Sequence, residues 1–366
     1  MSVFGLGRQG RVLVAQLGDT ERNRWIAGSS SLLKDNKIYL IDYDEDQDEI
    51  THAAYAHPDE ILSISPAPTK ADLFFSCSCK IEENIPILST TLWRFSQIDS
   101  DESGQLKQNG SNVLEEVTKL IPDGGQSDIH QLSFYMDGYL KVNHTLIMFA
   151  NFYFKMQTLS TVIAIPMDAE SCIGCAAWDP HHTSQISVAI GRNIIGWNIS
   201  TNSECFRIDL AHELPMRALD YNPNKPYHIV SGSDDCTIRI WDTRNTSTYL
   251  KNITDHSHWV WSVSFNRSHD QLLLSSSSDC QVNLDSVVSV SSVFFYDKNR
   301  FLSNSLVWLI SKATDGLIAS FDQHEEAVYS ASWSAADPWI FASLSFDGRV
   351  VVNQVPREEK YRIMDC

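Results

Sequence analysis

Short runs in which hydrophobic and polar residues alternate recur along most of the chain. One stretch shows the pattern well, with the runs and turns Arg217–Tyr221, Asn222–Pro226, Tyr227–Gly232, Ser233–Asp235 and Cys236–Trp241. A period of two, β-branched residues within the runs, and Pro, Asn, Gly and Asp between them are typical of strands joined by hairpins. Helical periodicity is absent, so we predict an all-β fold.

This stretch is one copy of a repeat. Three segments share its texture, at residues 212–245, 256–289 and 324–356. In each copy a His precedes an Asp by the same interval, from 212 to 235, from 256 to 279 and from 324 to 347. The first two copies begin 44 residues apart (256 − 212), within the window of about 40–45 residues that forms one four-stranded propeller blade.

Ser231–Asp235 followed by Ile240–Asp242 resembles the signature of the WD-repeat family. The resemblance implies a β-propeller in which a His, a Ser, an Asp and a Trp form a buried hydrogen-bonded tetrad in each blade. The first copy supplies all four residues, namely His212, Ser231, Asp235 and Trp241. The later copies supply three each, namely His256, Ser275 and Asp279, with Asp285 at the Trp position, and His324, Ser343 and Asp347, with Asn353 there.

A His, an Asp and a Ser can also form a hydrolase triad, in which the carboxylate orients an imidazole that activates the hydroxyl. Catalysis needs one such set in a cleft. Three copies at one spacing favour a structural network that satisfies buried polar groups. Since the chain also lacks a glycine-rich phosphate loop, a G-x-S-x-G elbow and an H-E-x-x-H helix, we expect no catalytic residues and no enzyme.

Weaker copies extend the repeat towards the N-terminus. We predict one WD-repeat propeller over residues 1–366, seven-bladed with one degenerate blade and an atypical insertion. The predicted blades cover residues 11–50, 57–95, 112–170 (the degenerate blade), 172–200, 212–245, 256–289 and 318–356, and the insertion covers 293–317.

Two stretches depart from the repeat. Residues 96–171 contain the apolar run Leu146–Phe154 in place of a regular blade, and residues 293–317 contain the apolar runs Val293–Tyr296 and Leu306–Ile310. Exposed apolar insertions favour aggregation. Our hypothesis is that these stretches are incorrectly spliced or translated intron sequence; the alternative is that they are genuine folded sequence.

The charge balance excludes two classes of function. The chain has 46 Asp and Glu against 28 Lys and Arg, a formal net charge of −18. Nucleic-acid binding requires clustered basic residues, and adhesion to an anionic membrane requires a polybasic segment. Residues 146–165 are long enough to span a bilayer, but Lys155 near their middle argues against insertion. Without a secretory signal, we predict a cytoplasmic protein.

Two groups of residues invite a metal site. Cys172, Cys175, His181 and His182 could bind zinc, but no second Cys pair exists, so we favour buried thiols. The acidic run Asp42–Glu49 could bind calcium, yet it lacks the spaced Asp and the turn Gly of an EF-hand, so we favour a solvated loop. We expect no metal and no cofactor.

The C-terminal copies carry a more specific resemblance. His256–Val263, Ser334–Ser345 and Asp347–Arg349 resemble the propeller family that interacts with the EARP and GARP complexes. The match covers about residues 1–95, 172–292 and 318–364. It implies a scaffold that binds these tethers, working with small GTPase-linked machinery, as a monomer within a larger assembly. It also implies a location at the trans-Golgi network and at early and recycling endosomes, with roles in endosome-to-Golgi retrieval, endosomal recycling and dense-core vesicle maturation.

The same family pattern suggests where a partner binds. The position five residues after each repeat His opens near one face of the propeller in this family, which points to Leu62, Arg217, Trp261 and Tyr329. Arg, Trp and Tyr are enriched in interface hot spots, and Trp259 on the same strand is a further candidate. Packing between blades is the alternative role for Trp261 and Tyr329.

A different function stays open as an alternative. Trp241–Arg244 resembles the W-D-x-R box through which some propellers dock onto a cullin ubiquitin ligase, with Arg244 as the contact residue. The chain would then be a substrate receptor. The same box also ends many blades for packing alone.

Overall fold

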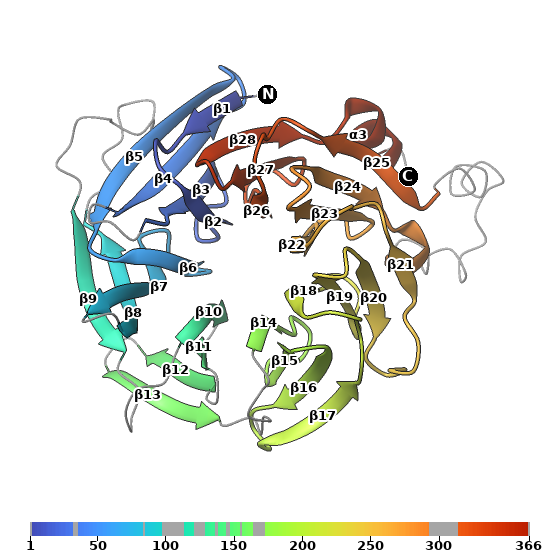
Figure 1. The fold of residues 1–366 in the computed structure, drawn as a ribbon, viewed down its shortest axis with the longest axis horizontal. Coiled ribbons are helices and arrows are strands. Elements are labelled where there is room, and N and C mark those ends of the chain that lie inside the picture. Colours follow the sequence, from blue (N-terminus) through green and yellow to red (C-terminus); the bar gives the residue numbers. More distant parts are fainter. Residues whose placement is uncertain are drawn as a thin grey trace.

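The strands of this chain form a ring of sheets around a central axis (Figure 1). The computed structural model describes residues 2–31, 36–82, 85–96, 113–120, 129–135, 138–143, 147–153, 156–163, 173–292 and 314–364. Seven four-stranded sheets are present, and every strand pair within them is antiparallel. The prediction of an all-β WD-repeat propeller is confirmed.

The first four sheets follow one another in chain order. Within each of them the first strand lies nearest the centre of the ring and the fourth lies outermost. The first holds β2 (Gly10–Ala15), β3 (Asn23–Ser29), β4 (Asn36–Asp44) and β5 (Glu49–His57). The second holds β6 (Glu60–Pro66), β7 (Leu73–Glu82), β8 (Ile85–Phe95) and β9 (Leu114–Leu120). The third holds β10 (Ile129–Tyr135), β11 (Gly138–Asn143), β12 (Ile147–Tyr153) and β13 (Met156–Ile163). The fourth holds β14 (Ile173–Trp178), β15 (Gln185–Ile190), β16 (Asn193–Asn198) and β17 (Ser203–Ile208).

The remaining three sheets complete the ring. The fifth holds β18 (Met216–Tyr221), β19 (His228–Ser233), β20 (Ile238–Asp242) and β21 (Lys251–Ile253). The sixth holds β22 (Val260–Phe265), β23 (Leu272–Ser277), β24 (Val282–Ser286) and β25 (Gly316–Phe321). The last holds β26 (Val328–Trp333), β27 (Ile340–Ser345), β28 (Arg349–Gln354) and β1 (Ser2–Gly5). A 3-10 turn (Val288–Val290) and the helix α3 (Arg357–Met364) lie outside the sheets.

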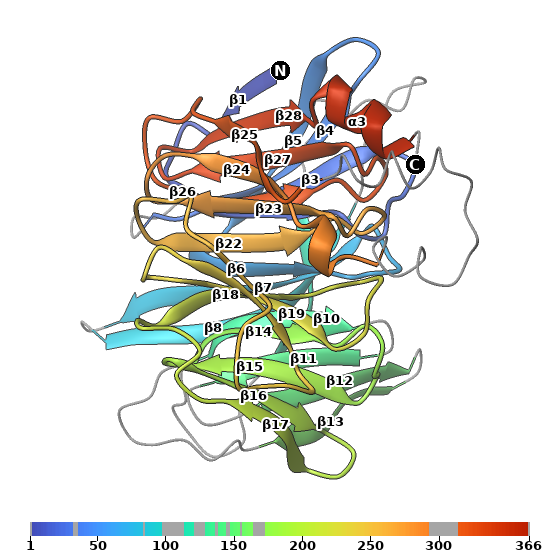
Figure 2. The ribbon, with the colours of Figure 1, turned by 90° about the vertical axis from the view of Figure 1, so that its right-hand side faces the viewer.

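The hydrophobic core lies between neighbouring sheets, which stack face to face (Figure 2). Between the fifth and sixth sheets, for example, Val230 and Ile240 pack against Val260 and Phe265, and all four are buried. Similar clusters join the first sheet to the second and the sixth to the last. The second strands β19, β23 and β27 contain only buried residues, among them the serines that take part in buried hydrogen bonds.

The ring closes through the two ends of the chain. β1, from the N-terminus, pairs with β28, and the register runs from Ser2 opposite Val352 to Gly5 opposite Arg349. A further core cluster joins this sheet to the first one, with Trp25 packed among Ile340 and Val350. Closure removes the exposed sheet edge that an open arc would leave.

The predicted blade ranges miss the outermost strands. β9, predicted within the degenerate blade 112–170, is the outer strand of the sheet before it, and β25 belongs to the sheet that the range 256–289 left incomplete. β1 was not predicted. An outermost strand has a neighbour on one side only and carries little apolar signal, and no residue of β25 is buried. Of the predicted insertion 293–317, residues 293–313 lie outside the described residues.

The clasp between the chain ends makes a stability prediction. Gly348 has φ +82°, its carbonyl accepts a hydrogen bond from the Leu6 N–H (2.8 Å), and a Cβ there would lie 1.8 Å from the Arg8 carbonyl oxygen. Gly348→Ala should lower the free energy of unfolding by at least about 1 kcal/mol, because the residue would be strained and the chain would have to move.

Gly5→Ala is the matched control, because it lies on the same clasp at negative φ with no atom within 4 Å of the added Cβ. Chemical or thermal unfolding of both variants measures the difference. Equal stability of the two would contradict this account of the clasp.

Candidate protein-interaction face

A β-bulge interrupts the innermost strand of each sheet. At each bulge the register skips one residue, which has no partner across the ladder. These residues are Arg11, Leu62, His130, Gly174, Arg217, Trp261 and Tyr329. A bulge redirects a side chain away from the regular alternation. The positions predicted by counting from the repeat His, including Leu62, are therefore bulge residues.

Four of the predicted partner-binding residues form one chain of direct contacts. The Arg217 guanidinium carbon is 4.6 Å from the centre of the Trp261 ring and 5.5 Å from that of Trp259. The Trp261 ring centre is in turn 4.5 Å from that of Tyr329. The predicted candidates on β18, β22 and β26 thus form one continuous surface, whereas Leu62 is not in contact with it among the described contacts.

Two residues that the sequence pattern did not single out extend this surface. The Arg11 guanidinium carbon lies 5.4 Å from the Tyr329 ring centre and 5.6 Å from that of Phe346. Arg11 was missed because Leu6, not a His, stands five residues before it. We refer to the whole set as the aromatic–arginine patch: Arg11, Arg217, Trp259, Trp261, Tyr329 and Phe346.

Hydrogen bonds to neighbouring residues fix the patch in position, while its outer side is accessible to solvent. Arg217 donates two hydrogen bonds of 2.8 Å to the carboxylate of Asp234, and this contact raises the pKa of Arg217. The Trp261 indole N–H donates to Ser278 at 2.6 Å. The Trp259 side chain is 41% exposed, Arg11 is exposed, and the other aromatic rings are half-buried. Fixed aromatic and arginine side chains are the residue types that dominate protein-protein hot spots.

The predicted tetrad of the first copy lies directly beneath this face. His212 Nδ1 is 3.0 Å from Asp235 Oδ2, His212 Nε2 is 2.7 Å from Ser231 Oγ, and the Trp241 indole N–H donates to the same hydroxyl at 3.1 Å. Burial alone would raise the pKa of Asp235, but hydrogen bonds from His212 and Thr237 outweigh it and hold that pKa well below its usual range.

These contacts have one consistent arrangement of protons. Burial lowers the pKa of His212, so its imidazole is neutral and donates from Nδ1 to Asp235 while Nε2 accepts from Ser231. The geometry is that of an Asp-His-Ser triad. Ser231 is fully buried, however, and its oxygen already accepts the Trp241 N–H, so this hydroxyl cannot reach a substrate. The network stabilises the turn Ser233–Cys236 instead.

The second copy keeps the first half of the network. His256 bonds to Asp279 (2.9 Å) and to Ser275 (2.9 Å). At the Trp position stands Asp285, which is 1% exposed and which no N–H or hydroxyl of the described residues reaches. Burial first, and then the carboxylate of Asp255, raise the pKa of Asp285 to about 7.

The third copy departs from the predicted geometry. His324 bonds to Ser343 (2.8 Å), but its Nδ1 meets Ser345 (2.9 Å), and Asp347 is hydrogen-bonded to Ser345 in place of the His. The expected direct contact between His324 and Asp347 is therefore wrong. The backbone N–H of Arg349 bonds to Asp347 as Thr237 and Gln281 bond to the Asp of their own copies; what sets this copy apart is the Arg349 guanidinium, whose Nε lies 3.9 Å from Asp347.

A fourth network was missed. His57 Nε2 lies 3.1 Å from Ser76 Oγ, to which the Trp93 indole N–H donates at 2.8 Å. In all four networks the His and the Ser are 19 residues apart, and this interval was the available signal. The Ser and the Trp are 17 residues apart here, against 10 in the first copy, because the β7–β8 hairpin is longer.

Arg244 makes its contacts within its own turn. Its guanidinium donates to Asp242 at 2.9 and 2.7 Å and lies 4.7 Å from the centre of the Tyr227 ring, while the side chain is 61% exposed. Contacts with nearby residues therefore explain the position of Arg244 in the box Trp241–Arg244 without a partner protein. Arg244 is not part of the aromatic–arginine patch.

The metal alternatives find little support in the geometry. Cys175 is buried in a core cluster, and burial raises the pKa of its thiol; Cys172 lies outside the described residues. In the acidic run, Asp42 pairs with Arg24 (2.9 Å), and Asp48 accepts a 3.0 Å hydrogen bond from Tyr43. Within the described ranges, no helix is long and apolar enough to cross a bilayer.

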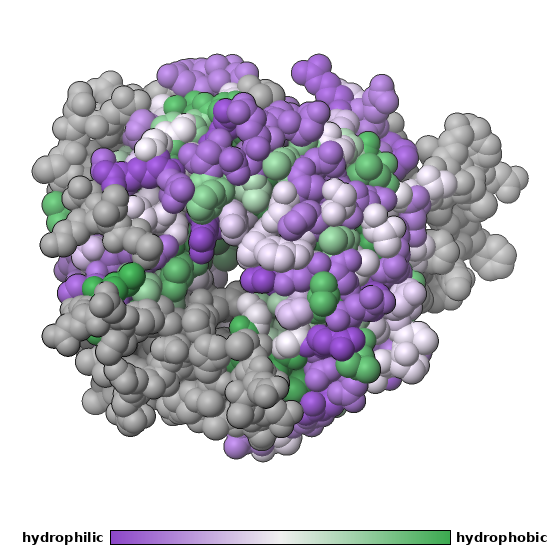
Figure 3. Space-filling view, viewed as in Figure 1, coloured by the Kyte–Doolittle hydropathy of each residue, from purple (hydrophilic) through white to green (hydrophobic). Residues whose placement is uncertain are grey.

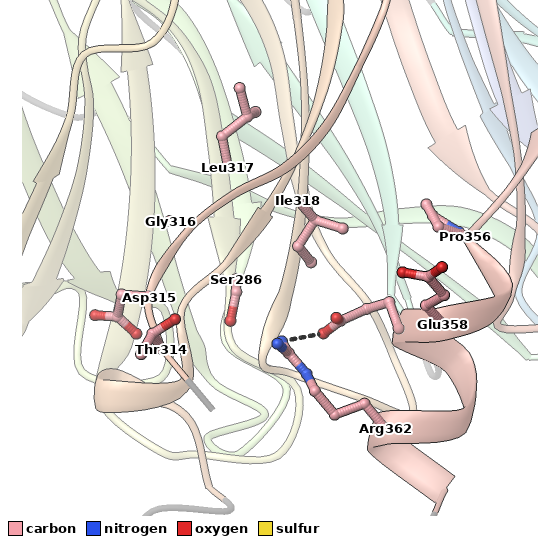
Figure 4. A pocket seen from close by; sticks show the side chains of 10 residues that line it. Ser286, Thr314, Asp315, Gly316, Leu317, Ile318, Pro356, Glu358 and Arg362 are labelled. Carbon is pink, nitrogen blue, oxygen red and sulfur yellow. Dashed lines mark hydrogen bonds and ion pairs between the residues drawn. The ribbon is translucent and has the colours of Figure 1, made fainter. Parts of the chain in front are cut away.

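A hollow with a volume of about 310 Å³ lies beside α3 (Figure 4). Its only ion pair among the described lining residues joins Glu359 and Arg362 at 2.5 Å. No described group of three His, Cys, Asp or Glu residues could hold a metal. Figure 3 shows one face of the ring, on which the hydrophobic residues described around the central opening are scattered among hydrophilic ones.

Asp285 makes a pH prediction. Its folded-state pKa of about 7 lies above its ordinary value of 3.8, so its contribution to stability is full below pH 4 and is lost as the pH rises to 7. Asp285→Asn should therefore raise the free energy of unfolding at pH 8 by about 1–3 kcal/mol, because no charge has to be buried. Asn353 already occupies the equivalent position in the next sheet.

Unfolding of the parent chain and the variant from pH 5 to pH 8 tests this prediction, and the gain should shrink towards pH 5. Asp279→Asn is the control: it makes the same change in the same sheet but weakens the bond to His256, so it should destabilise the protein. A gain that does not depend on pH would sink the idea.

The comparison with known proteins agrees with this architecture. A family model described as EIPR1 beta-propeller matches residues 1–284, and one described as WD domain, G-beta repeat matches residues 316–352. The chain is 35% identical over 379 residues to "EARP-interacting protein homolog" of Gekko japonicus. It is 32% identical over 391 residues to "EARP and GARP complex-interacting protein 1" of Homo sapiens, and 31% identical over 373 residues to "EARP-interacting protein 1" of Caenorhabditis elegans.

Each of these alignments covers 99% of this chain and 98% of the relative. They include the stretch 96–171 that departs from the repeat pattern, and the strands β9 to β13 lie there. Near-complete coverage together with the match over residues 1–284 extends the likeness well beyond the shared repeat. The chain therefore belongs to the EIPR1 beta-propeller family.

Proposed function

We propose that this protein is a non-enzymatic adaptor that binds the EARP and GARP tethering complexes. The observation that carries the proposal is the near-full-length identity of 31–36% to relatives whose names state an interaction with these complexes. A propeller suits such a role because it presents loops from many blades on one rigid ring. In this proposal the ring has seven blades, and β10–β13 forms the blade that lacks the repeat residues.

The cellular role follows from the partners. The adaptor works in the cytoplasm at the trans-Golgi network and at early and recycling endosomes. There it supports endosome-to-Golgi retrieval, endosomal recycling and dense-core vesicle maturation, together with small GTPase-linked machinery. It acts as a monomer within the larger tether assembly.

The aromatic–arginine patch is the proposed contact surface for the tether. It combines exposed Trp259 and Arg217 with rings whose positions are fixed by Ser278 and Asp234. Fixed side chains lose little conformational entropy when a partner binds, which favours affinity. The cullin alternative is disfavoured, because Arg244 is already bound to Asp242 within its own turn.

Substitutions in the patch test the proposal. Arg217→Ala and Trp259→Ala should each weaken the binding of purified EARP and GARP about tenfold or more, because each removes a hot-spot side chain from the contact surface. Binding can be measured by biolayer interferometry, with thermal unfolding to verify that each variant folds.

Two variants serve as matched controls. Arg244→Ala removes an exposed arginine that also sits over an aromatic ring, and Tyr361→Ala removes an aromatic side chain that is 63% exposed on α3. Both should bind like the parent chain. If the parent binds neither complex, the proposed function is wrong; if all four variants bind equally well, the tether contacts another surface.

A further inference from the structure

The loops of the fifth, sixth and last sheets, around Arg217, Trp261 and Tyr329, carry charge of one sign, whereas the segment that leads into β2, where Arg11 lies, contains Arg8. The segments that lead into β18, β22 and β26 are residues 209–215, 254–259 and 322–327, and the turns after β19, β23 and β27 are residues 234–237, 278–281 and 346–348. Together these segments contain no Lys and no Arg. They contain ten carboxylates: Asp209, Glu213, Asp234, Asp235, Asp255, Asp279, Asp322, Glu325, Glu326 and Asp347.

Three of these carboxylates, from two neighbouring sheets, act on the same thiol. Besides burial, Asp279, Asp347 and Glu326 raise the pKa of the Cys280 thiol, although Glu326 and Asp347 belong to the neighbouring sheet. Glu213 and Glu326 are exposed, and neither makes an ion pair with a described residue. These loops therefore carry an excess of negative charge, which Arg349, near Glu325 and Asp347, and Arg207, near Asp209, offset in part.

The patch itself shows how it holds a cation. The Arg217 guanidinium lies against the face of Trp261 while two of its three nitrogens, Nε and Nη2, bond to Asp234, and Arg11 lies over Tyr329 and Phe346. An aromatic face next to a carboxylate is a favourable site for a guanidinium or an ammonium group. Trp259 is 41% exposed on a loop that contains no Lys or Arg, and Glu213 is exposed on the loop that leads into the neighbouring β18.

From this arrangement we infer that the aromatic–arginine patch docks a basic segment of its partner, in which lysines or arginines flank an apolar anchor. The apolar anchor packs on Trp259 and Trp261, and the basic side chains meet the surrounding carboxylates. An acidic partner segment would be repelled by the same loops. This inference rests on the proposed function for the identity of the partner, but the chemistry of the docked segment is read from this chain alone.

Charge reversal at the two unpaired glutamates tests the sign of the partner. Glu213→Lys combined with Glu326→Lys should weaken the binding of purified EARP or GARP about tenfold at low salt, and the deficit should shrink as salt is raised. Glu21→Lys makes the same change on the exposed β2–β3 turn, at the far end of β2 from Arg11, and should bind like the parent chain. Unchanged or tighter binding by the double variant would overturn the inference and leave the proposed function standing.

A second measurement decides the inference without the tether. Two synthetic peptides serve as probes: one has lysines around a single phenylalanine, and the other has glutamates in place of the lysines. Calorimetric titration should detect the basic peptide on the parent chain, with binding lost in Trp259→Ala and weakened in the double charge reversal. Equal binding of the two peptides, or binding of the basic peptide that Trp259→Ala leaves intact, would refute the inference even if the tether binds.

Discussion

Every feature of this protein depends on the pairing of β1 with β28, because that ladder joins the two ends of the chain and closes the ring. Each sheet is covered on both faces by its neighbours, so no sheet has a complete core without the sheets beside it. An arc that lacked closure would expose an apolar face at each end and the hydrogen-bonding edge of β28. The turn at Gly348 contacts the N-terminal segment so closely that it leaves no room for a side chain.

The buried polar networks hold the loops of the closed ring in fixed positions, and these loops form the interaction face. Each His-Ser pair connects the loop that enters a sheet with the second strand of that sheet, as His212 does with Ser231 on β19. The bulge follows within five residues, so the loop, the bulge and the turn at Asp235 are held as one unit. Neighbouring units contact one another through Arg217, Trp261 and Tyr329, and the interaction face is rigid for this reason.

The repeated intervals located most of the buried networks but little of the outermost strands. The constant intervals found the His, Ser and Asp of the complete copies, because a buried hydrogen-bonded network tolerates little change in geometry. The intervals did not find Trp93, whose hairpin is longer, and they could not show that His324 bonds to Ser345 in place of Asp347. The outer strands β9 and β25 gave almost no signal, since a strand with one neighbour and an exposed face needs no particular residue. Contacts such as that of Arg11 with Tyr329 join residues more than three hundred positions apart, which no local pattern reveals.

Most strand residues must serve both the folding of the sheet and the surface that it presents. The bulges separate these two roles. An exposed bulge residue such as Arg217 contributes neither a partner in the ladder nor a side chain to the core, so exchanging it alters the surface at small cost to folding; Gly174 is an exception, since an added Cβ would lie 2.0 Å from the Met216 carbonyl oxygen. The seven bulges already hold residues as different as Gly174, Leu62, Arg217 and Trp261. Across evolution, a ring built in this way can acquire new partners one position at a time while the sheets beneath it stay the same.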